Sequence, residues 1–206
     1  MTNWLKIPLL WCLLFLMAPL LVATTYRAEL QPESFTEYEA SDSRDTWRGR
    51  APLETLELTF DSDALSELSL EATLKPGRFD SGNRIRDANA RRGVFETGEY
   101  PLVTLTAQGV EAQGVEAGAA SLAVGETERV SLVGTLTMHG VTRGVRIPAE
   151  VSLENTDGRV LRASGSFDVL LSDYGMDRPS FLGTTVNDEV SVRFNVVGAL
   201  SETSTN

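Results

Sequence analysis

Few residue types in this chain of 206 residues could do chemistry, and they are scattered. The only histidine, His139, lies between two strand-like runs in the segment MHGVTRGV. A lone histidine cannot form a multi-histidine metal site, and its place in a turn favours a hydrogen bond to the backbone. The sequence has no glycine-rich phosphate loop and no G-x-S-x-G nucleophile elbow, although the spacing of its carboxylates does not exclude a paired-carboxylate hydrolase. We therefore expect no catalytic residue, no metal and no cofactor.

The only cysteine, Cys12, lies within an apolar run over residues 4–23 whose single charge is Lys6. The remainder of the chain therefore has no disulfide, no thiol nucleophile and no thiolate metal site. The run has the layout of a secretory signal cleaved after Ala23, and its length also fits a membrane anchor. Cleavage is favoured because strand-like sequence begins at Tyr26, which would leave an anchored domain almost no tether. Both interpretations predict export, to the periplasm, the cell envelope or the medium.

The chain is acidic, with a net charge of −11 that becomes −12 without Lys6. This sign disfavours nucleic acid and anionic membrane surfaces as partners. The segment RIRDANARR (residues 84–92) nevertheless holds four arginines, and it is the one stretch that predicts a short helix. One interpretation is a solvated helix whose arginines pair with Asp87 and nearby acids. The other is a positive patch in which Arg84 and Arg86 contact a phosphate or another polar head group.

Hydrophobic and polar residues alternate over the longest runs of the sequence, which span residues 66–75, 130–138, 145–153, 161–171 and 190–198. Sustained alternation with period two predicts strands, because successive side chains of a strand point to opposite faces. Pro148 argues further against a helix in its run and marks an edge or a bulge. Shorter runs predict strands at 26–30, 34–40, 55–60 and 102–107.

The connections between these runs predict antiparallel pairing. His139-Gly140 and the segment NTDG (155–158) are typical of tight turns. No stretch is long and periodic enough for the crossover helix that parallel strands need. Roughly eight strands with one apolar face each can close as a barrel or fold over as a sandwich. Residues 108–117, QGVEA written twice, predict a surface loop or hairpin extension, or else a partner-binding loop.

Several inward positions carry small residues, namely Ala72, Gly134, Ala149, Ala163 and Gly165. Small side chains on inner faces can leave an apolar cavity. The alternative is that the glycines allow the sheet to bend while other side chains fill the space. The interior of an eight-stranded barrel is just wide enough either to be filled by side chains or to hold one small ligand.

Three segments resemble, in the same order, motifs of the YceI-like, polyisoprenoid-binding proteins. Residues 77–107 carry an R-D pair that opens a helix, a phenylalanine and a Y-P pair. Residues 133–151 resemble the family's G-x-L-T-x-H-G-V-T-x-x-V element, and residues 171–177 and 186–199 resemble its R-S-D-F-G-I turn and closing strand. The matching motif positions are Asp87, Phe95, Tyr100, Pro101, His139, Gly140, Asp173, Tyr174 and Gly175.

The resemblance implies an all-β fold, an extended eight-stranded antiparallel lipocalin-like barrel with one or two short helices. It divides the chain into a signal or anchor (1–23), a barrel domain (24–200) and a polar tail (201–206). It also implies an elongated internal pore for apolar ligands, chiefly long isoprenoid chains. The sequence departs from the family at Leu171, where arginine is expected, at 47–60, which match poorly, and at the QGVEA repeat, which resembles an insertion.

We therefore expect a non-catalytic carrier or storage protein for an isoprenoid, an isoprenoid quinone or another lipid. The alternative is a ligand-free structural or stress-related envelope protein with a filled barrel. The sequence does not choose between a monomer and a dimer, and an uncleaved N-terminus would add a membrane contact. From their phase in the alternating runs, the residues expected to line the pore are Leu68, Leu70, Leu105, Leu132, Leu136, Val145, Ile147, Phe167, Val192 and Phe194.

Overall fold

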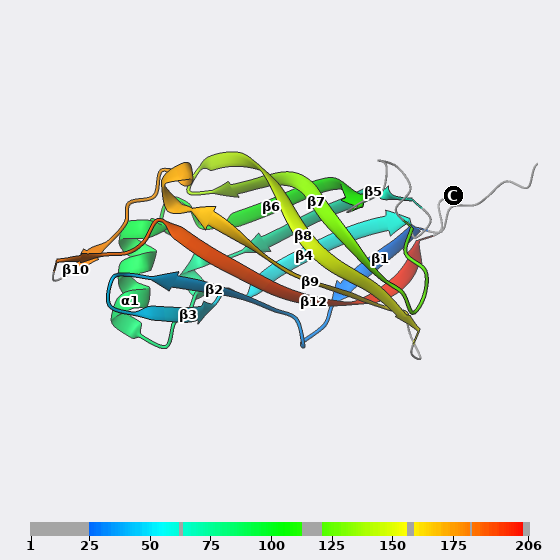
Figure 1. Cartoon of the computed structure of the whole chain (residues 1–206), viewed down its shortest axis with the longest axis horizontal. Coiled ribbons are helices and arrows are strands. Elements are labelled where there is room, and N and C mark those ends of the chain that lie inside the picture. The colour runs from blue at the N-terminus through cyan, green and yellow to red at the C-terminus, as the bar shows by residue number, and fades with distance from the viewer. Residues whose placement is uncertain (1–24, 62–63, 113–120, 156–158, 182, 204–206) are drawn as a thin grey trace, which may run out of the picture.

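The computed structural model describes residues 25–61, 64–112, 121–155, 159–181 and 183–203, and shows an elongated antiparallel barrel (Figure 1). Eight strands follow one another around the barrel, and pairing of the first with the last closes it. In the order of their pairing, these strands are β1 (Thr25–Leu30), β4 (Leu53–Asp61), β5 (Ala64–Leu74), β6 (Val103–Ala112), β7 (Thr127–Met138), β8 (Val141–Asn155), β9 (Arg159–Leu170) and β12 (Glu189–Thr203).

The predicted barrel and its antiparallel pairing are thus confirmed. His139 and Gly140 form the tight turn between β7 and β8. At Pro148, strand β8 pairs with β7 alone, because its pairing with β9 begins only at Glu150. This position suits a proline, which has no amide hydrogen to donate to a second strand. The second turn, at 156–158, lies outside the described residues, as does the second copy of the QGVEA repeat, whereas the first copy ends strand β6.

A hairpin lengthens one side of the barrel. It consists of β2 (Phe35–Ser41) and β3 (Thr46–Arg50), and β2 continues along β12 where β1 stops. Strand β3 lies at the edge of the sheet and reaches the β5 side only through a bridge between Arg50 and Asp80. The sequence did not predict β3, because its five residues show no alternation. The barrel wall is therefore incomplete at this end.

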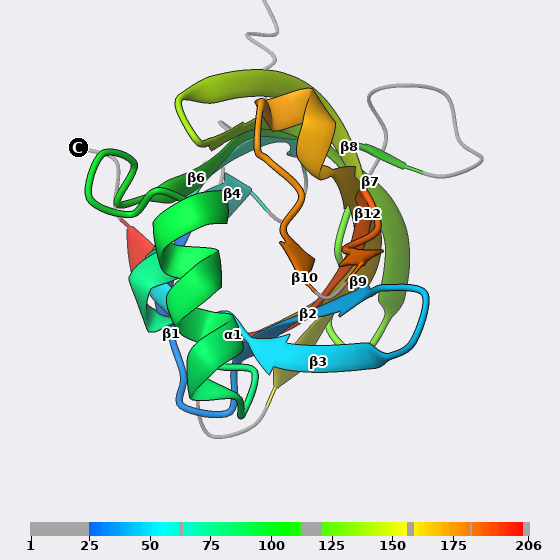
Figure 2. The same ribbon diagram turned by 90° about the vertical axis from the view of Figure 1, so that its left-hand side faces the viewer.

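A short helix lies at the incomplete end (Figure 2). Helix α1 (Arg84–Asn89) follows the 3₁₀ helix η1 (Pro76–Arg78) and continues as one π-helical turn, η2 (Ala90–Val94). It begins at Asn83, whose side-chain oxygen accepts hydrogen bonds from the amides of Ile85 and Arg86, a typical N-cap. The helix expected over residues 84–92 is thus present and slightly longer.

The remaining elements cross the same end of the barrel. A 3₁₀ helix, η3 (Leu171–Tyr174), follows β9, and the short strands β10 (Ser180–Phe181) and β11 (Thr184–Thr185) pair with each other. In the end-on view, β10 lies within the outline of the ring of strands. The boundary expected at residue 200 needs correction, because β12 runs on to Thr203 and its last residues pair with the start of β1.

Candidate functional site: an apolar pore in one half of the barrel

The barrel is packed at one end and hollow at the other. Where β1 begins and β12 finishes, buried side chains fill the interior, and the rings of Tyr26 and Phe60 lie 5.4 Å apart. Leu58 and Leu161 belong to this cluster and also line the hollow half, so they form its floor. The cavity above them, called the pore below, has a volume of about 580 Å³ and extends to α1. Typical ligand pockets measure roughly 300–1,000 Å³.

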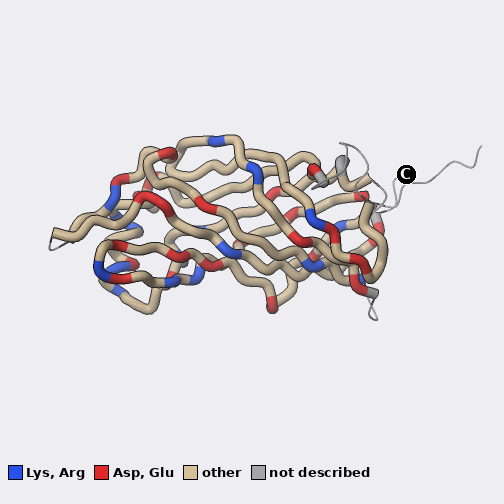
Figure 3. Tube along the Cα trace, in the orientation of Figure 1, with Lys and Arg blue, Asp and Glu red and all other residues tan. Residues whose placement is uncertain are grey.

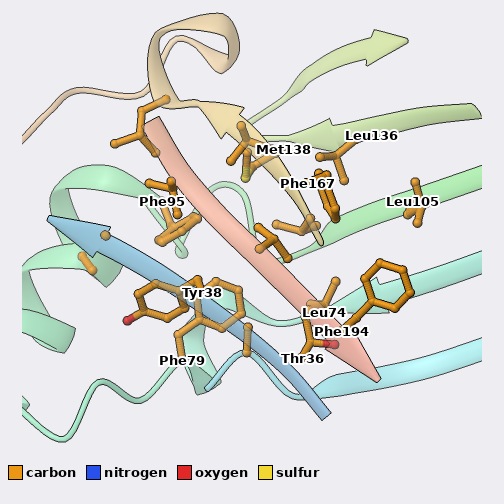
Figure 4. Close-up of a pocket in the computed structure, with 18 of the residues that line it drawn as sticks. Thr36, Tyr38, Leu74, Phe79, Phe95, Leu105, Leu136, Met138, Phe167 and Phe194 are labelled. Carbon is orange, nitrogen blue, oxygen red and sulfur yellow. The ribbon is translucent and has the colours of Figure 1, made fainter. Parts of the chain in front are cut away.

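The wall of the pore is built from leucine, valine, isoleucine and phenylalanine side chains of the strands (Figure 4). They point inward because alternate residues of each barrel strand face the interior. Most of the residues predicted from the alternation do lie in this wall, namely Leu70, Leu105, Leu132, Leu136, Ile147, Phe167, Val192 and Phe194.

Two of the predicted residues lie elsewhere. Leu68 packs against the cluster that closes the barrel, below the floor of the pore. Val145 packs against a second buried cluster that includes Leu136, Met138 and Tyr174. Alternation gives the face of the sheet to which a side chain belongs, but it gives neither the position along the barrel axis, which excludes Leu68, nor the packing of neighbouring side chains, which covers Val145.

The small inward residues have both of the roles considered above. Ala72 and Ala163 line the pore and leave room in it. A methyl group on Gly165 would lie 2.2 Å from the carbonyl oxygen of Pro148 and 2.8 Å from the Phe194 ring, so other groups already fill this space. Gly134 lies against the backbone of β6 beside a register shift, where a methyl group would come within 2.0 Å of a carbonyl oxygen. Ala72 and Ala163 thus widen the pore, whereas Gly134 lets the sheet bend.

Aromatic rings gather on one side of the mouth, which lies at the α1 end. The ring of Phe79 lies 5.8 Å from that of Tyr38 and packs edge-on against Phe95 at 5.2 Å. Gly49 of β3 makes room for Tyr38, since a methyl group there would come within 2.4 Å of the ring. Burial, and then the carboxylate of Asp87, raise the pKa of Tyr38. The hydroxyl of Tyr38 therefore stays protonated at neutral pH.

Arg86 and Asp87, the R-D pair, hold α1 at this mouth through hydrogen bonds. Asp87 is buried, and its Oδ1 accepts hydrogen bonds from the amide and the hydroxyl of Ser81 at 3.0 and 2.6 Å. Arg86 donates through Nε and Nη2 to the hydroxyl and carbonyl oxygens of Ser81, and its guanidinium lies 4.7 Å from the centre of the Trp47 ring. Arg86 lines the pore, whereas the exposed Arg84 lines a separate, more open pocket with other arginines.

The H-G-V-T element also joins distant segments. The imidazole of His139 packs against Tyr100 at a tilt of 55°, with ring centres 4.4 Å apart, and its Nε2 lies 2.9 Å from a carboxylate oxygen of Glu96. Its Nδ1 lies 3.3 Å from the carbonyl oxygen of Tyr174, which is the expected backbone contact. Gly140 has φ of 73°, and a methyl group on it would lie 2.8 Å from the Tyr100 ring. His139 is outside the pore wall, in a structural position.

The remaining motif positions form the turn after β9. Tyr174 is buried in the cluster beside the mouth, and Gly175 ends η3 in the left-handed conformation with φ of 66°. Asp173 is exposed, and its carbonyl oxygen accepts a hydrogen bond from Nε of Arg143. Leu171, where the family motif has arginine, is buried in the pore wall. Pro101 is exposed before β6.

Three polar residues of the mouth were not predicted from the sequence. Asp42 and Asp45, in the turn between β2 and β3, line it, and so does Thr184 of β11. Thr184 is 6% exposed, and its hydroxyl oxygen has no hydrogen-bond partner among the described residues. These residues come from stretches without periodicity, so only the folded topology brings them to the pore.

A family model for the YceI-like domain matches residues 31–198. The chain belongs to the YceI-like family. A comparison with curated proteins finds no match.

Solved structures share the fold of this YceI-like chain. BcnA of Burkholderia cenocepacia superposes with a TM-score of 0.65 at 16% identity, over 82% of this chain and 99% of that one. A polyisoprenoid binding domain from Saccharophagus degradans, implicated in plant cell wall breakdown, gives 0.63 at 17% identity, over 85% and 98%. The YceI protein of Campylobacter jejuni gives 0.55 at 19% identity, over 76% and 85%.

The described part of this YceI-like chain holds no group of three or more histidine, cysteine or acidic residues arranged to bind a metal ion. Among the same residues, no helix is long and apolar enough to cross a membrane. In the view of Figure 3, acidic and basic residues are interspersed along the trace of the described residues. The pore is the feature of the described residues with the chemistry of a binding site.

Proposed function

We propose that this protein binds a long apolar molecule, an isoprenoid or another lipid chain, in the pore and stores or carries it without changing it. The observation that carries the proposal is the hollow, almost wholly apolar half of the barrel. Burial of a chain against such a wall contributes roughly 0.8 kcal/mol for each methylene removed from water. A cavity with a packed floor suits a flexible chain that enters at the α1 end.

The family supports the same class of ligand, since the domain from Saccharophagus degradans is described as polyisoprenoid-binding. Two motifs that resemble the YceI-like pattern, Arg86-Asp87 and His139-Gly140, hold together segments around the mouth. These residues have structural roles here, so they support the shape of the site and leave the ligand's identity to experiment.

A filled barrel without a ligand is the alternative. At the packed end of the barrel, side chains fill the interior, and the rings of Tyr26 and Phe60 are in contact there. The α1 end differs, because small residues such as Ala72 and Ala163 lie where bulky side chains would be needed to fill it. This contrast favours a binding function.

We also propose that the protein works outside the cytoplasm. The apolar run over residues 4–23, with its early Lys6, supports export. A carrier for a water-insoluble chain has a use there, because the aqueous space of a cell envelope separates the membranes in which such chains dissolve.

The test is extraction of protein purified from its own cells with organic solvent, followed by mass spectrometry. We expect a long-chain lipid in stoichiometric amount, and we expect the emptied protein to take up a fluorescent lipid. A clean extract together with no uptake would overturn the proposal in favour of the filled barrel.

A further inference from the structure

Three arginines of the helical segment at the mouth differ from those of the barrel wall in having no acidic partner. On the wall, arginines pair with glutamates of neighbouring strands, as Arg129 of β7 does with Glu150 of β8. Arg84, Arg91 and Arg92 form no ion pair with any of the described residues, and Arg84 and Arg92 are exposed. These guanidinium groups are therefore available to an anion outside the chain.

The local charge of this segment is opposite in sign to that of the whole chain. Residues 84–92 hold four arginines and one acid, the buried Asp87, whereas the chain has a net charge of −11. Exposed charges farther apart than about 8 Å are largely screened at physiological ionic strength. The barrel is elongated and α1 lies at one end of it, so acids of the packed end, such as Glu128 and Glu202, do not cancel the arginines.

Acids also lie near the mouth, and groups of the protein bind them. Asp80 accepts a hydrogen bond from the amide two residues further on, and Glu96 lies 2.9 Å from Nε2 of His139. Asp42 and Asp45 accept hydrogen bonds from amides of their own turn. These acids are thus engaged locally, whereas the three arginines are not.

An apolar side chain lies beside these arginines. Ile85 is 75% exposed, more than any other large hydrophobic residue in the described part of the chain. It also lines the pore, so it lies on the rim of the mouth, where α1 faces the viewer of Figure 2. An apolar side chain among basic ones is typical of a helix that lies in the interface of a bilayer, with its apolar part in the acyl boundary and its basic groups on phosphates.

We propose that the α1 end of the barrel docks on an anionic membrane, with Arg84, Arg91 and Arg92 on lipid phosphates and Ile85 in the acyl boundary. The mouth of the pore then opens onto the bilayer, so an apolar chain passes between membrane and pore without crossing water. This surface goes beyond the proposed function, because it binds head groups outside the pore and does not depend on a ligand inside it.

The test is binding of the protein, purified from its own cells, to vesicles, measured by flotation. One set of vesicles contains equal parts of phosphatidylglycerol and phosphatidylcholine, and the other contains phosphatidylcholine alone. We expect tighter binding to the anionic set, and we expect it to weaken as salt is added. Arg84→Gln with Arg91→Gln should weaken it by roughly 25-fold, about 5-fold for each arginine.

The matched control for charge is Arg129→Gln with Arg162→Gln on the barrel wall. It makes the same change in net charge, far from α1, and should leave binding to the anionic vesicles nearly unchanged. Equal losses for the two pairs of substitutions would show that only the net charge matters and would overturn the docking surface.

The apolar contact has its own test. Ile85→Asn should weaken binding to the anionic vesicles by roughly 10-fold, because it removes an apolar side chain from the acyl boundary. Val124→Asn is the control, since Val124 is also exposed but lies beside Leu153 at the packed end. Equal effects of the two substitutions would contradict the role of Ile85.

A fluorescent label shows which end of the barrel meets the bilayer. In a chain with Cys12→Ser, an environment-sensitive label on Ile85→Cys should report an apolar surrounding on anionic vesicles. The same label on Ser201→Cys, exposed at the packed end, should stay in water. A signal from Ser201→Cys alone, or equal binding to both sets of vesicles, would overturn the docking, whereas an empty pore with the docking intact would overturn the proposed function alone.

Discussion

Phe194 stands opposite Gly165 where β12 pairs with β9, and its ring fills the space that a side chain at position 165 would need. Phe194 lines the pore, so this pair shapes the wall directly. The glycine lets a large ring lie close to the sheet, and the ring in turn covers backbone that would otherwise be bare.

Gly165→Ala should therefore destabilise the fold. Its methyl group would lie 2.2 Å from the carbonyl oxygen of Pro148, a backbone atom that cannot easily move. We expect a loss of about 1–3 kcal/mol in the free energy of unfolding, measured by urea denaturation. Gly144→Ala in β8 is the control, because its added methyl meets nothing within 4 Å. Equal stability of the two variants would show that the wall is looser than described.

Asp87→Ala should weaken the attachment of α1 to the mouth. The change removes the acceptor of two hydrogen bonds from Ser81, one of them 2.6 Å long, in a buried position. Ser81 would lose its partner for the amide, so we expect a cost of about 1–3 kcal/mol in urea denaturation. Asp80→Ala removes one exposed hydrogen bond to the amide of Gly82 and should cost much less. Similar losses for both aspartates would contradict this account.

The free energy of unfolding should depend on pH through the carboxylate of Asp188. The hydroxyl and the amide of Ser172 donate to its carboxylate and hold its pKa below its ordinary value. A lowered pKa in the folded state means that the unfolded chain binds more protons, so the stabilisation is present above the unfolded pKa and is lost as the pH falls through about 4 and below.

The measurement is urea denaturation of the native chain and of Asp188→Asn between pH 3 and pH 7. The native chain should be the more stable at pH 7, and the difference should shrink toward pH 3. Glu189→Gln, at the neighbouring exposed carboxylate, should show a difference that changes less with pH. A gap between the native chain and Asp188→Asn that is constant over the whole range would rule out the proposed linkage.

Much of the wall could be predicted because a strand repeats every two residues. Phe167 and Val192 face each other across β9 and β12 and both lie in the pore, as their phase in the sequence indicates. The prediction was wrong for Leu68 and Val145 as wall residues. Leu68 lies too deep, in the packed end of the barrel, whereas Val145 lies at the level of the pore but packs against neighbouring buried side chains. The ligand that the wall binds stays a prediction.

The mouth could be predicted only in part. The resemblance of residues 77–107 to the family indicated that Asp87 and Phe95 belong to a shared structure, and they do lie at the mouth. Thr184, Asp42 and Tyr38 come from the β11 segment and the β2–β3 hairpin, which meet α1 only after the barrel closes. Because no local pattern marks such residues, their place at the mouth follows only from the three-dimensional structure.

The most direct test of the account is whether the pore itself takes up an apolar chain. Ala72→Phe places a ring in the pore wall, and Ser69→Phe places the same ring on the exposed face of the same strand. Native mass spectrometry of each emptied protein with squalene should show a one-to-one complex for the native chain and for Ser69→Phe, and little or none for Ala72→Phe. No complex with the native chain, or equal uptake by the two variants, would contradict binding in the pore.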